Sequence, residues 1–212
     1  ISFYTFQTLS YTIDVYKRKL DPTDDFVAFS AFVCFFPQLV AGPIEKAKSL
    51  LPQVLSSRKF DYEKAKAGIC LMLYGLFKKV VIADNLAPIV DRFYEPSSFV
   101  TINMTEAVVA SISYAFQIYC DFSGYSDIAI GTASLFGISL MTNFKQPYFA
   151  ASAVEFWRRW HISLSTWFRD YVFIPLGGSR ESVWLNVRNI LVVFLVSGFW
   201  HGADWTFILW GL

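Results

Sequence analysis

Residues 189–205 read Asn-Ile-Leu-Val-Val-Phe-Leu-Val-Ser-Gly-Phe-Trp-His-Gly-Ala-Asp-Trp. Every residue from Ile190 to Val196 is apolar, so a helix formed here has no polar face to turn toward water. Because a helix needs about 20 residues to cross the bilayer core, residues 189–203 are too short for a straight span unless the helix continues through Asp204 into residues 205–212. The apolar run leads to His201, one of the two histidines in the chain. The stretch therefore predicts a membrane helix with a titratable side chain near its end.

The composition of the whole chain agrees with a membrane protein. Of its 212 residues, 55% are hydrophobic, 19% are aromatic and 17% are charged, and the mean hydropathy is +0.42. A chain of this hydrophobicity is not expected to be disordered. Its net charge of +1 is too small to attract nucleic acid electrostatically. The alternative, a soluble helical protein, requires polar faces at residues 26–40 and 190–196, and neither segment has one.

The predicted spans are broken by polar residues and turn residues. Pro37 and the Gly42-Pro43 pair should kink or end the first span, whereas Gly131 and Gly137 should allow close helix packing. Irregular backbone at membrane depth must be enclosed by protein or line a wet cavity, which indicates a bundle around a tunnel. We expect about five or six embedded segments, drawn from residues 26–44, 65–90, 103–119, 128–144 and 189–203, with loops at 21–25, 56–63 and 95–98.

Other sequence features narrow the fold further. No internal repeat is present, and the basic clusters do not alternate between segments, so the membrane orientation stays open. We interpret the three cysteines, Cys34, Cys70 and Cys120, as buried free thiols.

An amphipathic helix is expected at about residues 153–170, lying at the membrane interface or dipping in from it. At helical spacing, one face carries the apolar stripe Phe156, Trp160, Leu164 and Trp167, and another carries Arg158, Ser165 and Arg169. His161 falls on the border between these faces, either as a functional group or as part of an interfacial anchor. The helix should stop before Pro175, where Gly177-Gly178 turns the chain.

His201 is the stronger candidate for chemistry. A continuous helix would place it on one face with Ser197, Gly198, Asp204 and Trp205. Burial of the imidazole would lower its pKa and keep it neutral, which is the condition of a general base. The alternative is a hydrogen-bonded histidine with a structural role.

A polar cluster at residues 120–127 contains Asp121, Tyr125 and Asp127. On one helix the two carboxylates would point about 240° apart, so a carboxylate dyad or a two-aspartate metal site is not expected. The cluster therefore acts either as polar contact between helices or in substrate binding. We predict no metal site, and the chain has no phosphate-binding loop.

Five ordered blocks carry a family resemblance, at residues 36–45, 120–127, 155–171, 174–178 and 198–202. They read Phe-Pro-Gln-Leu-Val-Ala-Gly-Pro-Ile-Glu, Cys-Asp-Phe-Ser-Gly-Tyr-Ser-Asp, Glu-Phe-Trp-Arg-Arg-Trp-His-Ile-Ser-Leu-Ser-Thr-Trp-Phe-Arg-Asp-Tyr, Ile-Pro-Leu-Gly-Gly and Gly-Phe-Trp-His-Gly. Together they closely resemble the membrane-bound O-acyltransferase (MBOAT) family, in the branch that acetylates alginate.

The resemblance implies an all-α, polytopic membrane bundle in the bacterial cytoplasmic (inner) membrane. Because family members have further helices on both sides, residues 1–212 are expected to be one partial membrane domain of a longer chain. The implied activity is transfer of an acyl group, usually acetyl, toward hydroxyls of an exported polysaccharide such as alginate. No bound cofactor is implied; the donor is an acyl thioester such as acetyl-CoA, and the partners are the lipid membrane and periplasmic polysaccharide-modification proteins.

The resemblance also assigns roles to residues. It makes His201 the catalytic histidine and His161 the supporting one, a position that is Asn in eukaryotic members. The candidate substrate-binding residues are Trp157, Arg158, Ser165, Asp121, Tyr125, Asp127 and Trp200. As a hypothesis, His201 takes a proton from the acceptor hydroxyl, while His161, Trp157 or Arg158 stabilises the oxyanion.

Two other classes of function compete with the enzyme. A transporter or channel would use Glu106, Asp121 and Asp127 along an ion or proton path, although the lack of repeats weighs against it. A scaffold that only recruits periplasmic partners would leave both histidines without a task.

Overall fold

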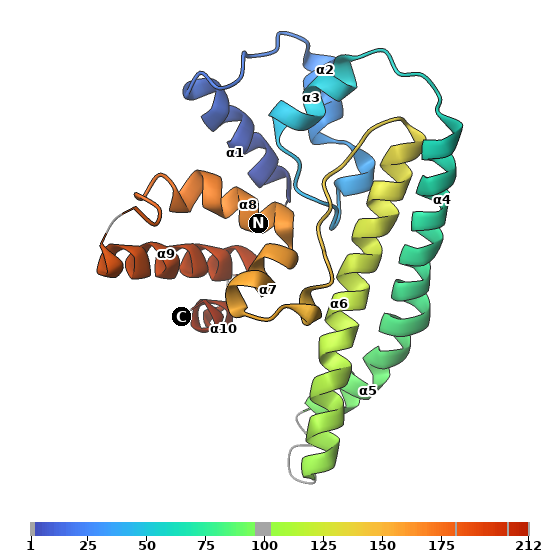
Figure 1. Cartoon of the computed structure of the whole chain (residues 1–212), viewed down its shortest axis with the longest axis vertical. Helices are drawn as coiled ribbons and strands as arrows, with labels where there is room; N and C mark the ends of the chain where they lie inside the picture. The colour runs from blue at the N-terminus through green and yellow to red at the C-terminus, as the bar shows by residue number, and fades with distance from the viewer. Residues whose placement is uncertain (1–2, 96–102, 181, 203, 212) are drawn as a thin grey trace. The chain divides into compact units, whose positions relative to one another are not determined.

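The structure, a computed structural model, describes residues 3–95, 103–180, 182–202 and 204–211. These residues form helices and turns and contain no strand, which confirms the all-α prediction. The chain divides into two compact units (Figure 1). Unit 1 comprises Ile1–Cys34, Ile44–Val54 and Phe144–Leu212, and unit 2 comprises Phe35–Pro43 and Leu55–Asn143.

Unit 1 is built mainly from short helices. They are α1 (Phe3–Tyr16), α2 (Phe26–Val33), α3 (Ala47–Leu55), the 3₁₀ turn η4 (Pro147–Phe149), α7 (Ala153–Arg159), α8 (Ile162–Phe168), the π-helical turn η5 (Arg169–Phe173), α9 (Val183–His201) and α10 (Trp205–Trp210). Unit 2 contains the 3₁₀ turn η1 (Phe36–Gln38), α4 (Tyr62–Leu76), the π-helical turn η2 (Phe77–Ala83), α5 (Asp84–Tyr94) and α6 (Met104–Leu135).

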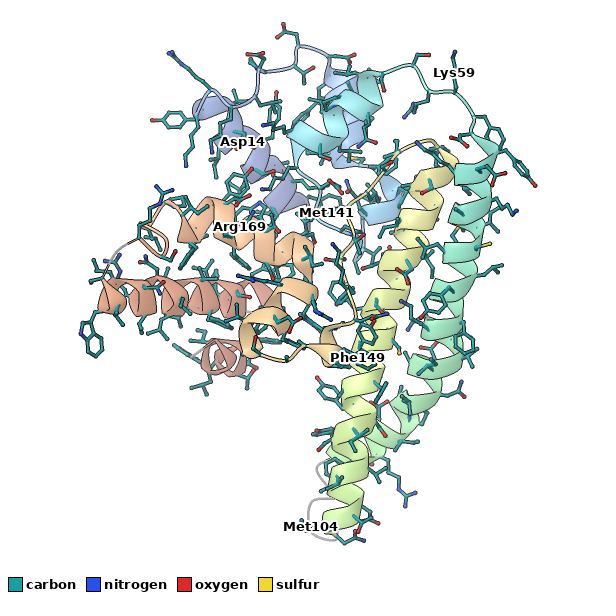
Figure 2. The ribbon with its side chains drawn as sticks, viewed as in Figure 1. Asp14, Lys59, Met104, Met141, Phe149 and Arg169 are labelled. Carbon is teal, nitrogen blue, oxygen red and sulfur yellow. The ribbon has the colours of Figure 1, made fainter. Side chains whose placement is uncertain are left out.

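In unit 2, α4 runs antiparallel to the later part of α6, and α5 packs on the same helix (Figure 1). Lys59, just before α4, and Met104, at the start of α6, therefore lie at opposite ends of the pair (Figure 2). Glycines set the separation of the two backbones. A Cβ on Gly131 would lie 2.4 Å from the carbonyl oxygen of Gly68, and a Cβ on Gly124 would lie 2.7 Å from that of Gly75. Both crossings require the absence of a side chain.

The single helix predicted at residues 65–90 is confirmed as helical, but its backbone changes type in the middle. The π-helical turn η2 separates α4 from α5 and contains Lys78 and Lys79. A π turn widens the helix by one residue per turn and rotates the side chains that follow it. Lys78 and Lys79 lie within this turn and pair with Asp127 and Asp121 of α6.

The prediction of two spans at 103–119 and 128–144 is wrong, because α6 is one helix of 32 residues. Its start has a capping box, in which Asn103 Oδ1 accepts from the Glu106 backbone and a Glu106 oxygen accepts from the Asn103 backbone, both at 3.0 Å. Its end is set by Gly137, which has φ of +71° and which therefore serves the helix terminus and not helix packing.

In unit 1, α2 ends at Val33, before Pro37, as predicted. The predicted loop at 21–25 is confirmed, and Asp25 caps α2 by accepting from the Ala28 backbone at 2.9 Å. The loop predicted at 56–63 ends earlier, because Asp61 caps α4 and Tyr62 already belongs to that helix. Of the loop predicted at 95–98, residues 96–98 lie outside the described residues.

Helix α9 corrects the prediction for the last span. It begins at Val183, not at Asn189, and reaches a length of 19 residues without continuing into residues 205–212. Its C-cap residue, Gly202, is extended, and α10 folds back onto α9, where a Cβ on Gly198 would lie 2.3 Å from the Phe207 carbonyl oxygen. Ala203, the predicted end of the span, lies outside the described residues.

By length and composition, α9 is the one helix among the described residues that is apolar enough to cross a membrane, with a mean hydropathy of 1.6. We predicted about five or six embedded segments. By these criteria, the described residues contain one. Helix α6 is longer, but Glu106, Asp121 and Asp127 interrupt its apolar sequence. All three cysteines are free, yet only Cys120 is buried, so the prediction of buried thiols is wrong for Cys34 and Cys70.

We expect Gly131→Val to lower the free energy of unfolding of the full-length parent protein by about 1–3 kcal/mol, because the new side chain forces α4 and α6 apart. Denaturant unfolding in detergent measures the change. Ser111→Val, at an exposed position on the same helix, is the control and should stay within about 0.5 kcal/mol of the wild type. Equal stabilities of the two variants would contradict the close approach of the backbones.

Candidate active site

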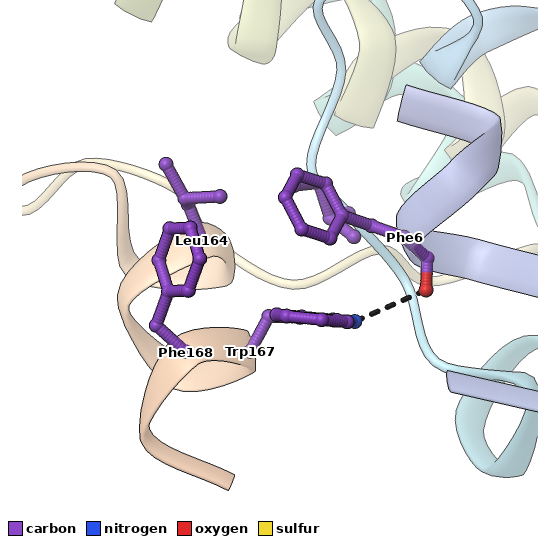
Figure 3. Close-up of a cluster of buried hydrophobic side chains, with 5 residues drawn as sticks. Phe6, Leu164, Trp167 and Phe168 are labelled. Carbon is purple, nitrogen blue, oxygen red and sulfur yellow. Dashed lines mark hydrogen bonds between the residues drawn. The ribbon is translucent and has the colours of Figure 1, made fainter. Parts of the chain in front are cut away.

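An aromatic and aliphatic cluster forms the core of unit 1 (Figure 3). Its buried members are Phe6, Ile44, Leu164, Trp167 and Phe168. Leu164, Trp167 and Phe168 share one face of α8 because they follow helical spacing. The Phe6 and Trp167 rings meet edge to face at 4.3 Å, and Trp167 Nε1 donates to the Phe6 carbonyl oxygen at 3.0 Å. The cluster thereby fixes α8 against α1.

His161 lies at the turn between α7 and α8, where the predicted continuous helix at 153–170 is wrong. Its backbone is left-handed, with φ of 43°, and Trp160 before it is extended. The Arg159 carbonyl, which a continued helix would use internally, accepts from the Lys145 backbone N–H at 2.9 Å. The helical spacing runs on across the break, which is why the sequence shows one stripe where the structure has two helices.

The His161 side chain is buried, with 5% of its surface exposed. The ring of Phe144 is stacked nearly parallel to it, at 14° and 6.4 Å between centroids. Burial lowers the pKa of the His161 imidazole, and the charge of His201 lowers it further. His161 is therefore an enclosed side chain whose lowered pKa favours the neutral imidazole.

His201 is the last residue of α9, and its Nδ1 lies 2.7 Å from the Ser197 carbonyl oxygen. A carbonyl can only accept, so Nδ1 is the protonated nitrogen in this contact. The prediction that Asp204 shares this helix face is wrong, because α9 ends at His201 and Asp204 instead caps α10. The prediction that His201 is buried is also wrong, since the described chain leaves it exposed.

Trp200 connects His201 to the core of unit 1. Its ring meets the His201 ring edge to face at 4.6 Å and the Phe6 ring at 5.1 Å. His161 begins α8, whose side chains form the other half of the same core. The two histidines, 40 residues apart in sequence, thus lie beside the same core, His201 through the Trp200 ring and His161 as the residue that precedes α8.

Other predicted residues of unit 1 lie nearby. Trp157 packs edge to face on Phe194 of α9 at 5.5 Å, and Arg158 is exposed beside it. Ser165 Oγ donates to the Trp160 carbonyl oxygen at 3.4 Å across the α7–α8 turn. Trp157 therefore links α7 to α9, whereas Ser165 supports the turn that holds His161.

Asp121, Tyr125 and Asp127 all belong to α6 of unit 2. Asp121 pairs with Lys79 at 2.6 Å, and Asp127 pairs with Lys78, whose Nζ also donates to Ser123 Oγ at 3.0 Å. Tyr125 is half-buried. The ion pairs join α6 to η2, which favours the role of polar contact between helices. With Glu106 in the capping box, no contact of these side chains favours the transporter or channel.

Sequence reasoning missed a polar network beside the core of unit 1. Tyr171 Oη donates to Asp14 Oδ2 at 2.7 Å, and Lys46 pairs with Asp170; Figure 2 labels Asp14 on α1. Burial raises the pKa of Tyr171, and the bond to Asp14 raises it further. Because 157 and 124 residues separate these partners, no local sequence pattern could have indicated them.

Asn189, predicted only as the start of a span, is fully buried and holds the turn at Gly177-Gly178. Its Nδ2 donates to the carbonyl oxygens of Leu176 and Gly178, both at 3.1 Å. The polar side chain of Asn189 at the start of a predicted apolar span was the one sequence feature that could have indicated this contact. In the described part of the chain, no group of three or more His, Cys, Asp or Glu side chains could hold a metal ion.

Residues 16–212 match the model of the MBOAT, membrane-bound O-acyltransferase family. The chain belongs to this family. Over 211 residues it is 47% identical to the probable alginate O-acetylase AlgI of Azotobacter vinelandii, covering all of this chain and 42% of that protein. It is 42% identical over 238 residues to the peptidoglycan O-acetyltransferase of Helicobacter pylori, covering all of this chain and 45% of that protein.

A more distant relative is the teichoic acid D-alanyltransferase of Streptococcus thermophilus, with 30% identity over 228 residues, all of this chain and 54% of that protein. The resemblance stated from the five sequence blocks is thus confirmed at the level of the family. The chain spans about half the length or less of these curated relatives, between 42% and 54%.

Because the backbone at His161 is left-handed, we expect a glycine variant at this position to be more stable than an alanine variant, the reverse of the usual order in helices. At φ of 43°, His161→Gly should be about 1 kcal/mol more stable than His161→Ala, because only glycine adopts this conformation without strain. At Ser165, inside α8, the order should reverse by about 1 kcal/mol, since glycine destabilises a helix interior. Thermal unfolding of the full-length parent tests both pairs, and a more stable alanine at both positions would contradict the left-handed turn.

Proposed function

We propose that this chain forms the catalytic part of a membrane O-acyltransferase that transfers an acyl group, acetyl by analogy with its O-acetylating relatives, toward hydroxyls of a cell-surface polysaccharide. One observation carries the proposal: His201 Nδ1 is bonded to the Ser197 carbonyl and its ring packs on Trp200, while the buried His161 begins α8, and both Trp200 and α8 contribute to one aromatic core. The names of the alginate and peptidoglycan O-acetylating relatives support the substrate class.

The chemistry assigns one task to each nitrogen of His201. Nε2 takes the proton from an acceptor hydroxyl as that oxygen attacks the thioester carbonyl, and the thiol leaves with the proton when the tetrahedral intermediate collapses. Nδ1–H remains bonded to Ser197 and holds the ring in the required tautomer and orientation. The edge of Trp200 against the imidazole limits rotation of the ring.

His161 has the surroundings of a helper and not of a base. Its neutral ring, enclosed by Phe144 and by the start of α8, is suited to donating one hydrogen bond to the oxyanion. Trp157 and Arg158, one turn earlier on α7, are the alternative donors. Enclosure of this side of the site also keeps water away from the thioester.

The proposed setting is a multi-pass protein of the bacterial cytoplasmic membrane, in which α9 is the most clearly membrane-spanning helix of this chain. The donor is an acyl thioester such as acetyl-CoA, and periplasmic polysaccharide-modification proteins are the proposed partners. The family's association with membranes and the 42–47% identity to O-acetylating relatives support this setting.

We expect His201→Ala in the full-length parent to reduce acyl transfer by about 10²–10⁴-fold, because general-base catalysis contributes about that much. His161→Asn should keep part of the activity, since Asn retains a donor and an acceptor and tolerates the left-handed backbone. Acetyl content of the polysaccharide product, measured by mass spectrometry in cells that lack the wild-type protein, reports the activity.

Val196→Ala, an exposed change in α9 about one turn before His201, is the control and should stay near the wild-type activity. Membrane levels of each variant must match those of the wild type. Near-wild-type transfer by His201→Ala together with loss in His161→Asn would reverse the two roles. Full activity of both variants would overturn the proposed function of this site.

A further inference from the structure

An open pocket of about 550 Å³ adjoins the α7–α8 turn of unit 1, and the proposed reaction gives it no role. Phe144, Lys145, Gln146 and Arg159 line it. The first three residues directly precede η4, the turn that carries Phe149 in Figure 2. This segment runs beside the end of α7 and supplies both the aromatic and part of the cationic lining.

The backbone of the pocket is held in a strained conformation. Gln146 has φ of 47°, and with His161 it is one of three non-glycine residues with positive φ in the described ranges. The Lys145 N–H bonds the Arg159 carbonyl at 2.9 Å, and Arg159 Nη1 donates to the Gln146 carbonyl at 3.4 Å. Strain of this kind persists only where the surroundings enforce it, and it concentrates at ligand sites.

Phe144 links this pocket to His161. Its ring is stacked along the imidazole at 14° and meets Trp160 edge to face at 5.1 Å. One wall of the pocket is therefore the side chain that covers His161. A molecule held in the pocket would therefore lie against the ring that covers the proposed oxyanion helper.

The charge of the pocket is positive. Lys145 is exposed, and no carboxylate of the described residues forms an ion pair with it. Arg159 pairs with Glu155, which is itself held ionised because the Ala151 backbone N–H and Arg159 lower its pKa. No acidic residue is among those that line the pocket. Both cationic side chains of this stretch, an ammonium and a guanidinium group, line the pocket, and such groups are typical of phosphate recognition.

We propose that this pocket binds a phosphate group of the acyl-thioester donor and thereby directs the thioester toward His161 and His201. The inference rests on the proposed function and adds the donor's anchoring site to it. Two donors share the chemistry, coenzyme A and the phosphopantetheine arm of an acyl carrier. Both carry a phosphate at one end of a neutral chain that ends in the thiol.

Isothermal titration of the full-length parent tests the proposal with three probes: coenzyme A, 4′-phosphopantetheine and pantetheine, which lacks phosphate. Lys145→Gln should weaken binding of at least one phosphate-bearing probe about three- to fivefold, the scale of one exposed ion pair. Pantetheine binding should not change. Higher salt should reduce the difference, because it screens exposed charges.

Two matched variants serve as controls. Lys145→Arg keeps the charge and should restore binding, and Lys48→Gln removes an exposed lysine on α3 and should leave the dissociation constants unchanged. Loss with coenzyme A alone identifies its adenosine phosphates as the bound group, whereas equal loss with 4′-phosphopantetheine identifies the phosphate shared with carrier proteins.

Unchanged binding of both phosphate probes in Lys145→Gln, no binding to the wild type, or an equal loss for pantetheine would overturn the phosphate site. Titrations in a His201→Ala background separate this inference from the proposed function, because they need no turnover. Suppose that the His201→Ala variant binds coenzyme A as tightly as the wild type does, and that the wild type shows no acyl transfer in the activity assay. The proposed function then fails, while the phosphate site stands.

Discussion

The contact between Trp167 and Phe6 is the interaction on which the rest of unit 1 depends. It combines an edge-to-face ring pair at 4.3 Å with a hydrogen bond from the indole to the Phe6 carbonyl, so both the apolar and the polar part of the tryptophan are used. Phe6 in turn packs on Trp200, the neighbour of His201. Loss of a buried aromatic side chain costs about 3–5 kcal/mol, and here it would also release the support of both histidines.

The reversal of the backbone at His161 places the second histidine. A straight helix from 153 to 170 would leave this side chain on the border of an exposed face, whereas the left-handed residue turns it into the interior, 5% exposed. The strain is offset by contacts made elsewhere, chiefly the Lys145–Arg159 backbone bond and the packing of α8 in the core. The same backbone bond shapes the neighbouring cationic pocket.

Unit 2 shows how charges are accommodated in helices with apolar surfaces. The lysines of η2 meet the aspartates of α6, and Lys78 also lies 4.8 Å from the centre of the Tyr74 ring. Paired in this way, the four charges tie one helix to the other at the level where the glycines bring the backbones close. Their arrangement fits a helix pair of fixed register, because each carboxylate has a lysine partner within its own unit.

The sequence by itself determined the helical class, the family and the two histidines, because these depend on composition, on spacing within a few residues and on ordered motifs. The start of α9 and the break before α8 were decided only by the tertiary structure. Apolar periodicity continues through both positions, and the deciding hydrogen bonds, such as Lys145 to Arg159, come from distant segments. Tyr171 and Asp14, 157 residues apart, are a pair for the same reason. The burial of the two histidines was also decided by the tertiary structure. α8 and Phe144 enclose His161, whereas the end of α9 at Gly202 leaves His201 exposed. The residues next to each histidine do not determine either outcome, because the enclosing groups come from other segments.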